Sequence, residues 1–483
     1  MPDWFHADGH AIARLVLQRG IGLVYLIAFI NALGQFRPLL GERGLLPVPR
    51  LLAQVRFRDA PSVFHLRYSD RLLVLVAGTG VVLALMVVLG LPDRWPVALT
   101  VALWLALWAL YQSIVNVGQR FYAFGWETLL LEAGFLAAFL GPAWSAVPAP
   151  ILWAFCWLLF RVEMGAGLIK LRGDPCWRDC TCLYYHHETQ PMPNPLSWWF
   201  HRLPKPLHRV EVVGSHVAQL VAPPLLFFPQ PIASVAAIVM AVTQVWLVLS
   251  GNFSWLNLLT IVLTVSAMDD ALFDRTTSGS GLTVVAWHDG LVALVCALVL
   301  VLSYRPARNL LSRDQRMNAS FDPLHLVNTY GAFGTVGRER FEIVLEGTTD
   351  AEIGPTTEWR EYDFRGKPTD PMRRPRQWAP YHLRLDWLMW FAGLSPMREM
   401  PWLDALLVKL LENDAPTLRL LARSPFVEGA PRAIRAVRYK YRFTTWRERR
   451  ETGAFWVRTR REEVVPAVRL GDSPSGLEIA PRS

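Results

Sequence analysis

The chain is short of charged residues. Only 18% of its 483 residues are Asp, Glu, Lys or Arg, whereas 52% are hydrophobic. A composition this apolar excludes a row of two to four soluble domains, which the length alone would indicate. The apolar residues form long runs between about Leu15 and Leu302, and the composition becomes ordinary after Tyr304. We therefore expect a membrane-embedded region over residues 1–304 and a soluble domain over residues 305–483.

The chain also lacks the short signatures of several enzyme classes. It contains no G-x-S-x-G nucleophile elbow, no H-E-x-x-H zinc motif and no phosphate-binding loop, and its Gly78-Thr79-Gly80 segment lies inside an apolar run. These absences exclude a serine lipase of the common kind. The first ten residues, MPDWFHADGH, carry no cationic segment of the kind that begins a cleavable signal. We therefore expect the first apolar run to act as its own insertion signal.

Several segments are apolar enough to cross a bilayer, which takes about 20 residues. Five are clear: residues 71–91, 97–115, 150–171, 231–250 and 282–303. Four are weaker because they are short or carry proline and charge, and some of these are expected to be re-entrant or interfacial: residues 15–33, 128–147, 212–229 and 254–268. The sequence thus predicts a polytopic α-helical membrane protein with about five to nine transmembrane helices and a C-terminal α+β domain.

Charged residues inside these segments indicate a polar interior. Each costs about 2.5–3.5 kcal/mol on insertion, so such residues usually face the bundle interior and have partners. Arg19 and Glu132 lie in two of the weaker spans, and Arg161 and Glu163 lie in the span 150–171. Because Arg161 and Glu163 are two residues apart, they point in different directions on a helix, and each should have a partner elsewhere in the bundle. A structural ion pair and a functional cavity both fit this pattern.

The positive charge bears on orientation. Residues 305–483 hold 30 of the chain's 49 Lys and Arg residues and 23 of its 40 Asp and Glu residues, a net charge of +7. The first 304 residues hold the other 19 basic and 17 acidic residues, a net charge of +2. With nine spans, the loops 34–70 and 172–210 fall on the same side of the membrane as the tail. Charge bias alone predicts that this side is cytoplasmic.

The longest polar break of the membrane region is the loop 172–210, which contains CWRDCTCLYYHHETQPMPNP. Its cysteines, Cys176, Cys180 and Cys182, have the spacing C-x3-C-x-C, which matches neither a C-x2-C zinc site nor a C-x-x-C redox pair. We therefore predict no metal here. A disulfide between two of the three is a further option if the loop faces an oxidising compartment, and it would leave one thiol free.

The second half of the loop has the composition of a recognition segment. Prolines at 191, 193 and 195 fix the backbone and push their predecessors to extended geometry. Trp198, Trp199 and Phe200 follow at once. Aromatic residues of this kind suit headgroup depth or a binding groove. We expect a stiff segment, edged by exposed tryptophans, that serves recognition rather than chemistry.

The tail is predicted to be a small α+β domain with antiparallel strands. Alternation of apolar and polar residues predicts a strand over 341–346 with one inward and one outward face. Further strands are expected over 359–365, 438–443 and 455–457, the last two joined by a turn at 451–453, with helices over 402–412 and 414–423. Arginine-rich strands interleaved with aromatic residues are also found in nucleic-acid-binding proteins. On a tail joined to a membrane bundle we predict instead a solvated surface and no nucleic-acid partner.

Residues 164–204, MGAGLIKLRGDPCWRDCTCLYYHHETQPMPNPLSWWFHRLP, closely resemble the signature of the lipase maturation factor family. These are polytopic membrane proteins that certain secreted lipases require to reach an active, assembled state. The resemblance covers about residues 120–460 and continues through the segments 250–262, 269–270, 328–348 and 381–392. Two positions depart from the family pattern, because Cys180 stands where it has an aliphatic residue and His187 where it has an aromatic one.

The resemblance and the charge pattern together define a set of candidate functional residues. Two are the interior charges of the bundle, two are the tryptophans of the loop, and the others match the family signature: Arg161, Glu163, Asp174, Cys176, Trp177, Arg178, Asp179, Cys182, His186, Glu188, Gln190, Pro193, Asn194, Trp198 and Trp199.

The function implied by the resemblance is that of a membrane-bound, chaperone-like maturation factor rather than an enzyme. It implies that an immature secreted lipase is bound through the loop 172–210 and the tail, and that the tail lies on the client side, contrary to the charge bias; we follow the family. The family implies the endoplasmic reticulum membrane, whereas the Arg-rich, Ala-rich composition points to a bacterial cytoplasmic membrane. No cofactor is predicted.

A second function is kept beside the first. The chain would then be a polytopic membrane enzyme, either a thiol oxidoreductase or a carboxylase-like protein. It would use the interior formed by Arg161 and Glu163 together with the cysteines and histidines of the loop.

Overall fold

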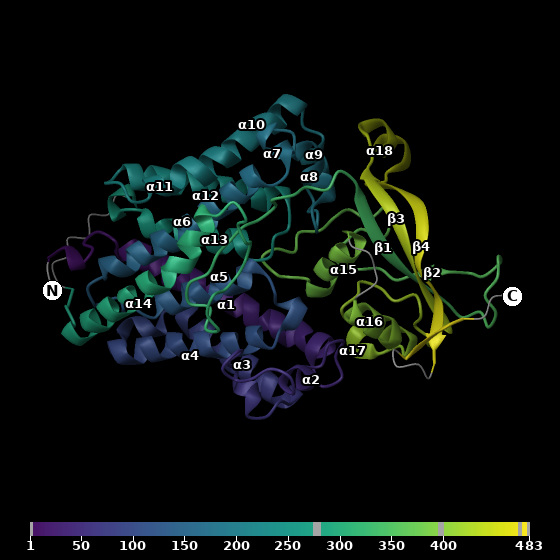
Figure 1. Ribbon diagram of the computed structural model, residues 1–483, viewed down its shortest axis with the longest axis horizontal. Helices are drawn as coiled ribbons and strands as arrows, with labels where there is room; N and C mark the ends of the chain where they lie inside the picture. The colour runs from purple at the N-terminus through teal and green to yellow at the C-terminus, as the bar shows by residue number, and fades with distance from the viewer. Residues whose placement is uncertain (1–2, 274–281, 395–399, 472–475, 481–483) are drawn as a thin grey trace.

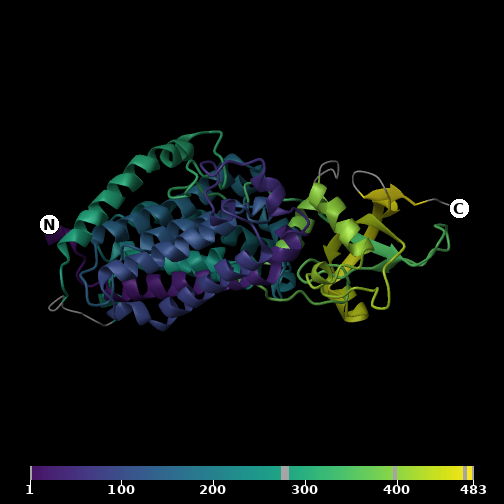
Figure 2. The same cartoon turned by 90° about the horizontal axis from the view of Figure 1, so that it is seen from below.

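The computed structural model describes residues 3–273, 282–394, 400–471 and 476–480. Figure 1 shows its two parts side by side along the longest axis: a helical bundle that includes the N-terminus, and an antiparallel sheet with its helices near the C-terminus. Figure 2 shows the same division from below. The predicted combination of a helical membrane region and a C-terminal domain with sheet and helices is confirmed.

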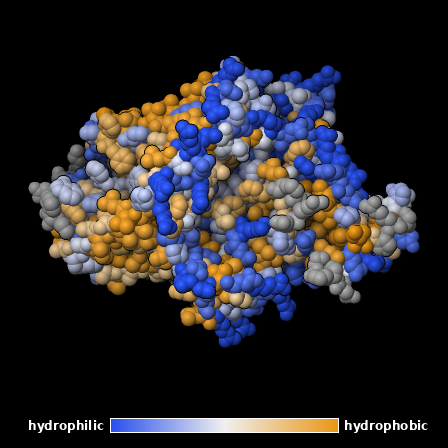
Figure 3. Space-filling model, in the orientation of Figure 1, coloured by the Kyte–Doolittle hydropathy of each residue, from blue (hydrophilic) through white to orange (hydrophobic). Residues whose placement is uncertain are grey.

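Six helices in the described part of the chain are long and apolar enough to cross a membrane. They include all five clear predicted spans and the first weak one, which becomes a helix of 30 residues. Figure 3 shows hydrophobic surface gathered over the bundle and hydrophilic surface over much of the C-terminal part. The six helices are α1 (Ala11–Leu40), α3 (Asp70–Leu89), α4 (Val97–Asn116), α6 (Ala149–Arg172), α12 (Ile232–Ser250) and α14 (Ala286–Leu311).

Three shorter segments return the chain between long helices, and they correspond to the three remaining weak spans. The loops that follow them gather near the start of α1: Arg14 donates to the Ser145 carbonyl (2.6 Å), and the Asp270 amide donates to the Gly9 carbonyl (2.8 Å). Over its described residues, the chain therefore passes between the two ends of the bundle in six long helices and three shorter segments. The segments are α5 (Gly125–Ala137), α10 (Lys205–His216) with its π-helical continuation Val217–Val221 and α11 (Ala222–Leu225), and α13 (Leu256–Thr264).

The loops 34–70 and 172–210 lie at the same end of the bundle as the tail, as the nine-span count predicts. In the first loop, Ser62 donates to the Ser113 carbonyl at the end of α4 (2.9 Å), and in the second Arg202 donates to the Thr444 carbonyl of the tail (2.6 Å). The helix α14 continues past residue 304 to Leu311 before the tail begins. The first loop contains the short helix α2 (Val48–Leu52).

The interior charges of the bundle find partners on other elements, as expected. The guanidinium of Arg161 pairs with Glu132 of α5 and also donates to the Asn328 carbonyl (2.6 Å). The other Glu132 oxygen accepts from the Asn328 amide (3.0 Å) and from the Tyr330 hydroxyl (2.8 Å). Glu163 accepts from Gln244 of α12 (2.7 Å). Arg161 and Glu163 therefore hold different pairs of elements together.

The C-terminal part is built on a five-stranded antiparallel sheet with the order β2-β1-β3-β4-β5. Several elements differ from expectation. The second strand is only two residues long, the helix expected over 414–423 has four residues, and the strand expected over 455–457 has fifteen. The turn expected at 451–453 is the end of a helix, α18, and neither α15 nor β5 was predicted. The elements are β1 (Arg340–Thr348), β2 (Arg360–Glu361), β3 (Ala433–Phe443), β4 (Trp456–Leu470), β5 (Leu477–Ile479), α15 (Arg384–Leu394), α16 (Pro401–Leu411), α17 (Ala415–Leu418) and α18 (Trp446–Thr452).

The strand β1 is buried on both faces, including the face to which alternation assigns Glu342, Val344 and Glu346. Glu342 is fully buried and pairs with Arg340 (2.5 Å) and Lys367 (3.2 Å). Arg340 in turn donates to backbone carbonyls of the loop 172–210. Alternation predicted the strand correctly, and the loop 172–210 covers the face that carries its charged residues.

The helix α15 fastens the C-terminal part to the bundle. Arg384 at its start is fully buried, pairs with Glu127 of α5 (2.8 Å) and donates from Nε to Asn31 of α1 (2.9 Å). Asn31 and Gln35 both donate to the His382 carbonyl (2.7 and 2.6 Å). A buried charge of this kind is tolerated only where it is paired and hydrogen-bonded. The docking of the two parts is therefore specific.

Removing one partner of the Arg161–Glu132 pair should be costly. In Glu132→Leu the Arg161 guanidinium stays buried without its counter-charge, and we expect a loss of about 3–5 kcal/mol. The measurement is the apparent Tm of the detergent-purified protein, followed by tryptophan fluorescence. The double variant Glu132→Leu/Arg161→Met is the control, because it removes both charges and should recover part of the loss. A single variant as stable as the wild type would contradict this prediction.

Candidate functional site

The loop 172–210 folds into three short helices, α7 (Pro175–Arg178), α8 (Leu183–Thr189) and α9 (Ser197–His201). A disulfide between Cys176 and Cys182 closes its first part and leaves Cys180 as a free thiol. Asp174 caps α7 by accepting from the Cys176 amide (3.0 Å), and it also pairs with Arg338 (2.8 Å). The predicted disulfide option is therefore the one that the structure adopts, and both bonded sulfurs are buried.

Polar side chains of the proline-containing part join the loop to the end of α12. Gln190 donates to the Ser250 carbonyl (2.9 Å), and Asn194 donates to the carbonyls of Val248 and Leu249 (both 3.0 Å). These carbonyls belong to the last turn of α12, where four backbone acceptors have no partner within the helix. Gln190 and Asn194 are thus needed to seat the loop on the bundle.

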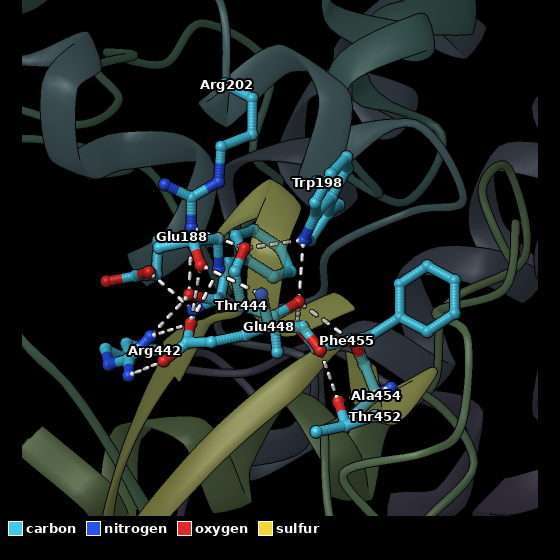
Figure 4. A network of polar contacts seen from close by, with 11 residues as sticks. Glu188, Trp198, Arg202, Arg442, Thr444, Glu448, Thr452, Ala454 and Phe455 are labelled. Atoms are coloured by element: carbon cyan, nitrogen blue, oxygen red, sulfur yellow. Dashed lines mark hydrogen bonds and ion pairs between the residues drawn. The ribbon is translucent and has the colours of Figure 1, made fainter. Parts of the chain in front are cut away.

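The aromatic part of the loop is joined to the C-terminal sheet by a polar network (Figure 4). Trp198 donates from Nε1 to the carbonyl and the hydroxyl of Thr444 (3.0 and 3.1 Å). Arg202 donates to the carbonyls of Phe443 (2.9 Å) and Thr444 (2.6 Å), and the Glu188 carboxylate accepts from the Phe443 amide (2.6 Å). We call this contact, made by residues 188–202 with the end of β3 and α18, the joint.

A buried arginine of β1 also contacts the loop and adds to the joint. Arg340 is 1% exposed and donates to the carbonyls of Glu188 (3.0 Å), Gln190 (2.5 Å) and Pro191 (3.0 Å). Prolines along this stretch remove backbone donors, so its carbonyls need partners from elsewhere. A single guanidinium with five donors supplies them.

The expectation that Trp198 is exposed is wrong. Its side chain is 0% exposed and packs with Tyr441, Phe443 and Trp456 of the sheet. Trp199 is half-buried, because Arg374 (5.1 Å to the ring centroid) and Arg449 (5.2 Å) lie over it. The reason is that the chain after β3 turns over the loop and covers the rings. The outermost aromatic residue of the joint is instead Trp446, which is 50% exposed and contacts Trp198 edge-to-face.

The remaining predicted residues divide between surface and core. Arg178 and Asp179 are exposed, whereas Trp177 is buried and donates to the Phe333 carbonyl (2.8 Å). Arg161 and Glu163 lie inside the bundle with partners of their own and are not brought together with the loop residues. His186 is buried against Phe333 and Phe253, and burial, reinforced by the neighbouring His187, lowers its pKa to about 3. It is therefore a neutral packing group at physiological pH.

Two groups of side chains in the described ranges could hold a metal ion. Asp174, Cys176 and Cys182 form the first, but the disulfide leaves no thiolate to bind a metal. His187, His208 and Glu211 form the second.

Several residues that build the site were missed from the sequence. Thr444, Arg202 and Arg340 make the joint, and Glu127 and Arg384 dock the C-terminal part. A signal was present for the last pair, because both are charges set among apolar and aromatic residues, in GWETLLL and YHLRLDWLMWFA. The three joint residues gave no such signal.

Comparison with known proteins identifies the two parts separately. The lipase maturation factor transmembrane domain matches residues 12–275, and the lipase maturation factor C-terminal domain matches residues 326–466. The chain is 41% identical to lipase maturation factor 1 of Bos taurus over 98% of this chain and 91% of the relative, and 39% identical to that of Homo sapiens over 97% and 90%. It is 29% identical to lipase maturation factor 2 of Homo sapiens over 96% and 84%. No solved structure matches the chain.

These relatives are vertebrate proteins, so they lend no support to the bacterial origin that the composition suggested. The multi-pass membrane character and the family resemblance of the loop are both confirmed.

Truncating Trp198 should loosen the joint. In Trp198→Ala a fully buried indole and two hydrogen bonds are lost, which costs about 3–5 kcal/mol. Trp198→Phe keeps most of the packing but removes the indole donor to Thr444, whose carbonyl still accepts from Arg202, so a smaller loss of about 1 kcal/mol is expected. The measurement is the rate at which a protease separates the C-terminal part from the bundle. Trp153→Ala is the matched control, because Trp153 is 64% exposed on α6; an equal effect there would contradict the prediction.

Proposed function

The chain belongs to the lipase maturation factor family, and on this premise we propose that it assists a secreted lipase to fold or assemble into its active form. The proposed client is an immature lipase, and the proposed contact surface is formed by the loop 172–210 together with the C-terminal part. We propose the endoplasmic reticulum membrane as the location, with the joint facing the compartment in which the client folds.

The joint is the observation that carries this proposal. Trp198 and Arg202 fasten the loop to a segment about 250 residues further along the chain. Arg340 fastens it to a strand about 150 residues away, so that these segments form one body at one end of the bundle. A client that meets this end would therefore meet the loop and the C-terminal part together. The buried motif residues of the joint hold the proposed client-binding surface in place, and the exposed residues beside them would contact the client.

We propose α18 as the centre of that contact. Trp446, Arg447 and Arg450 are exposed on it, and Arg442 and Glu448 pair at its start (2.6 Å) to hold it against β3. Tryptophan and arginine are the residue types that carry most binding energy at protein interfaces. The helix is also capped at both ends, by Thr445 with Glu448 and by Gly453 in a left-handed conformation.

The function is tested by co-expressing the chain with a secreted lipase in cells that lack their own maturation factor. The wild type should raise the specific activity of the secreted lipase. Trp446→Ala should fold normally, because surface substitutions usually change stability by less than about 0.5 kcal/mol. We expect it to weaken co-purification of the lipase by roughly 30-fold, the equivalent of about 2 kcal/mol.

Trp287→Ala is the matched control, since Trp287 is 52% exposed at the opposite end of the bundle. Failure of the wild type to raise lipase activity would refute the proposed function. If the wild type succeeds and Trp446→Ala performs equally well, the function stands and α18 is not the contact.

A thiol oxidoreductase is the second candidate, and one observation favours it. Arg338 Nη1 lies 3.5 Å from the Cys176 sulfur, where it would stabilise a thiolate after reduction of the disulfide. Both sulfurs are buried, which limits access to a substrate thiol.

The double variant Cys176→Ser/Cys182→Ser separates the two candidates. A thiol-based activity requires the sulfur atoms, so it would be abolished. A client-binding surface would be weakened only in part, because a disulfide that closes so short a loop contributes about 2 kcal/mol. Lipase activity in the co-expression assay is the measurement, and Cys180→Ser, which removes the free thiol of the same loop, is the control. Retention of part of the activity favours the maturation surface, and complete loss with normal folding favours redox chemistry.

A further inference from the structure

A second polar cluster lies between α8 and α10. His208 and Glu211 are three residues apart on α10 and face the same way, and His187 of α8 points toward them. The Glu211 carboxylate oxygen Oε2 lies 2.8 Å from His208 Nδ1 and 3.9 Å from His187 Nε2. One ligand atom from each residue lies within 4.8 Å of the other two.

His187 is left without hydrogen bonds by the part of the chain that the structure describes. Its side chain is 2% exposed, and both ring nitrogens are buried with no partner. Such a loss costs about 1–3 kcal/mol for a polar group. Neither nitrogen of the His187 ring is therefore engaged by another side chain or by the backbone of the described residues, so either could bind a ligand. A neutral imidazole is the form that binds metal ions.

The surroundings of the cluster are those of a metal ligand set. Trp246 of α12 donates from Nε1 to Glu211 Oε1 (2.8 Å), which leaves Oε2 directed at the two histidines. Phe200 packs against both the His187 ring (5.5 Å between centroids) and Trp246 (5.0 Å). Hydrogen bonds that orient a carboxylate ligand and an apolar shell around it both strengthen metal binding.

We propose that His187, His208 and Glu211 bind a zinc ion. Two imidazoles and one carboxylate are a frequent zinc ligand set, with water in the fourth position. Ligand atoms about 2.0–2.1 Å from a tetrahedral ion lie roughly 3.4 Å apart. The distances of 2.8 and 3.9 Å to Glu211 lie on either side of that value, and the histidine nitrogens lie within 4.8 Å of each other, so the rings would move toward the ion on binding. The ion would replace the hydrogen bond between His208 Nδ1 and Glu211 Oε2.

The consequence for the molecule is mechanical. The ion would fasten α8, which contains the start of the joint, to α10, which returns into the bundle. The loop would then be tied to the bundle by a metal in addition to its hydrogen bonds with α12.

The test uses the full-length protein, purified in detergent without a polyhistidine tag. After dialysis against a chelator, Zn²⁺ is titrated in competition with a chromophoric chelator, and the bound metal is counted by mass spectrometry. We expect one Zn²⁺ per chain. Co²⁺ in its place should show the strong visible absorption of a four-coordinate site with nitrogen and oxygen ligands.

Two variants test the ligands, and a third is the control. His187→Gln and Glu211→Gln should each weaken Zn²⁺ binding by more than about 100-fold, because even substitutions outside the ligand set cost 10–100-fold. His10→Gln is the matched control at the opposite end of the bundle and should bind as the wild type does. Glu211→Gln nearly preserves shape and can still accept from Trp246, so it is informative even if His187→Gln folds poorly.

The outcomes are decisive without any lipase in the assay, so they are independent of the proposed function. A wild type that binds neither Zn²⁺ nor Co²⁺ overturns the proposal. So does a Glu211→Gln variant that folds and binds Zn²⁺ as tightly as the wild type.

Discussion

The architecture depends on two buried glutamates of one short helix. Glu127 and Glu132 both lie on α5, and each holds an arginine from another element: Arg384 of the C-terminal part and Arg161 of α6. Inside an apolar bundle an unpaired guanidinium is far more costly than in water, so each pair admits few alternative arrangements. Because one of the two arginines belongs to the C-terminal part, the same constraint that organises the bundle also positions the domain outside it.

The loop 172–210 is held between these two bodies rather than hanging from one of them. Gln190 and Asn194 satisfy the exposed end of α12, and Arg340 satisfies the carbonyls of the loop. A segment rich in proline cannot use its own backbone for this purpose, so its order is supplied by side chains on both sides. The residues that make the family signature recognisable therefore build the surface more than they display it. What faces solvent at the joint is the neighbouring helix α18.

This arrangement changes how the motif of the loop is understood. In the linear sequence, cysteines, histidines and tryptophans so close together suggest a reactive site or an exposed recognition surface. In three dimensions they separate. Cys176 and Cys182 close the first turn, Trp198 enters the core of the sheet, and His187 turns toward α10. Each residue type keeps its ordinary chemistry, but the elements packed against it decide which part of that chemistry is used.

The sequence by itself determined the membrane helices, the place in the chain where the soluble tail begins, and the family. All three depend on local composition and on contiguous motifs. A run such as residues 71–91 is apolar whatever surrounds it. Because inserting a charged residue into the membrane costs free energy, Arg161 and Glu163 already indicated that each must have a partner. Which partners those are, and that Trp198 is buried, were decided only by the tertiary structure. The contacts that hold the tertiary structure together join residues up to about 350 positions apart, such as Gln35 and His382. No local sequence pattern encodes the carbonyl or carboxylate that a distant side chain will contact.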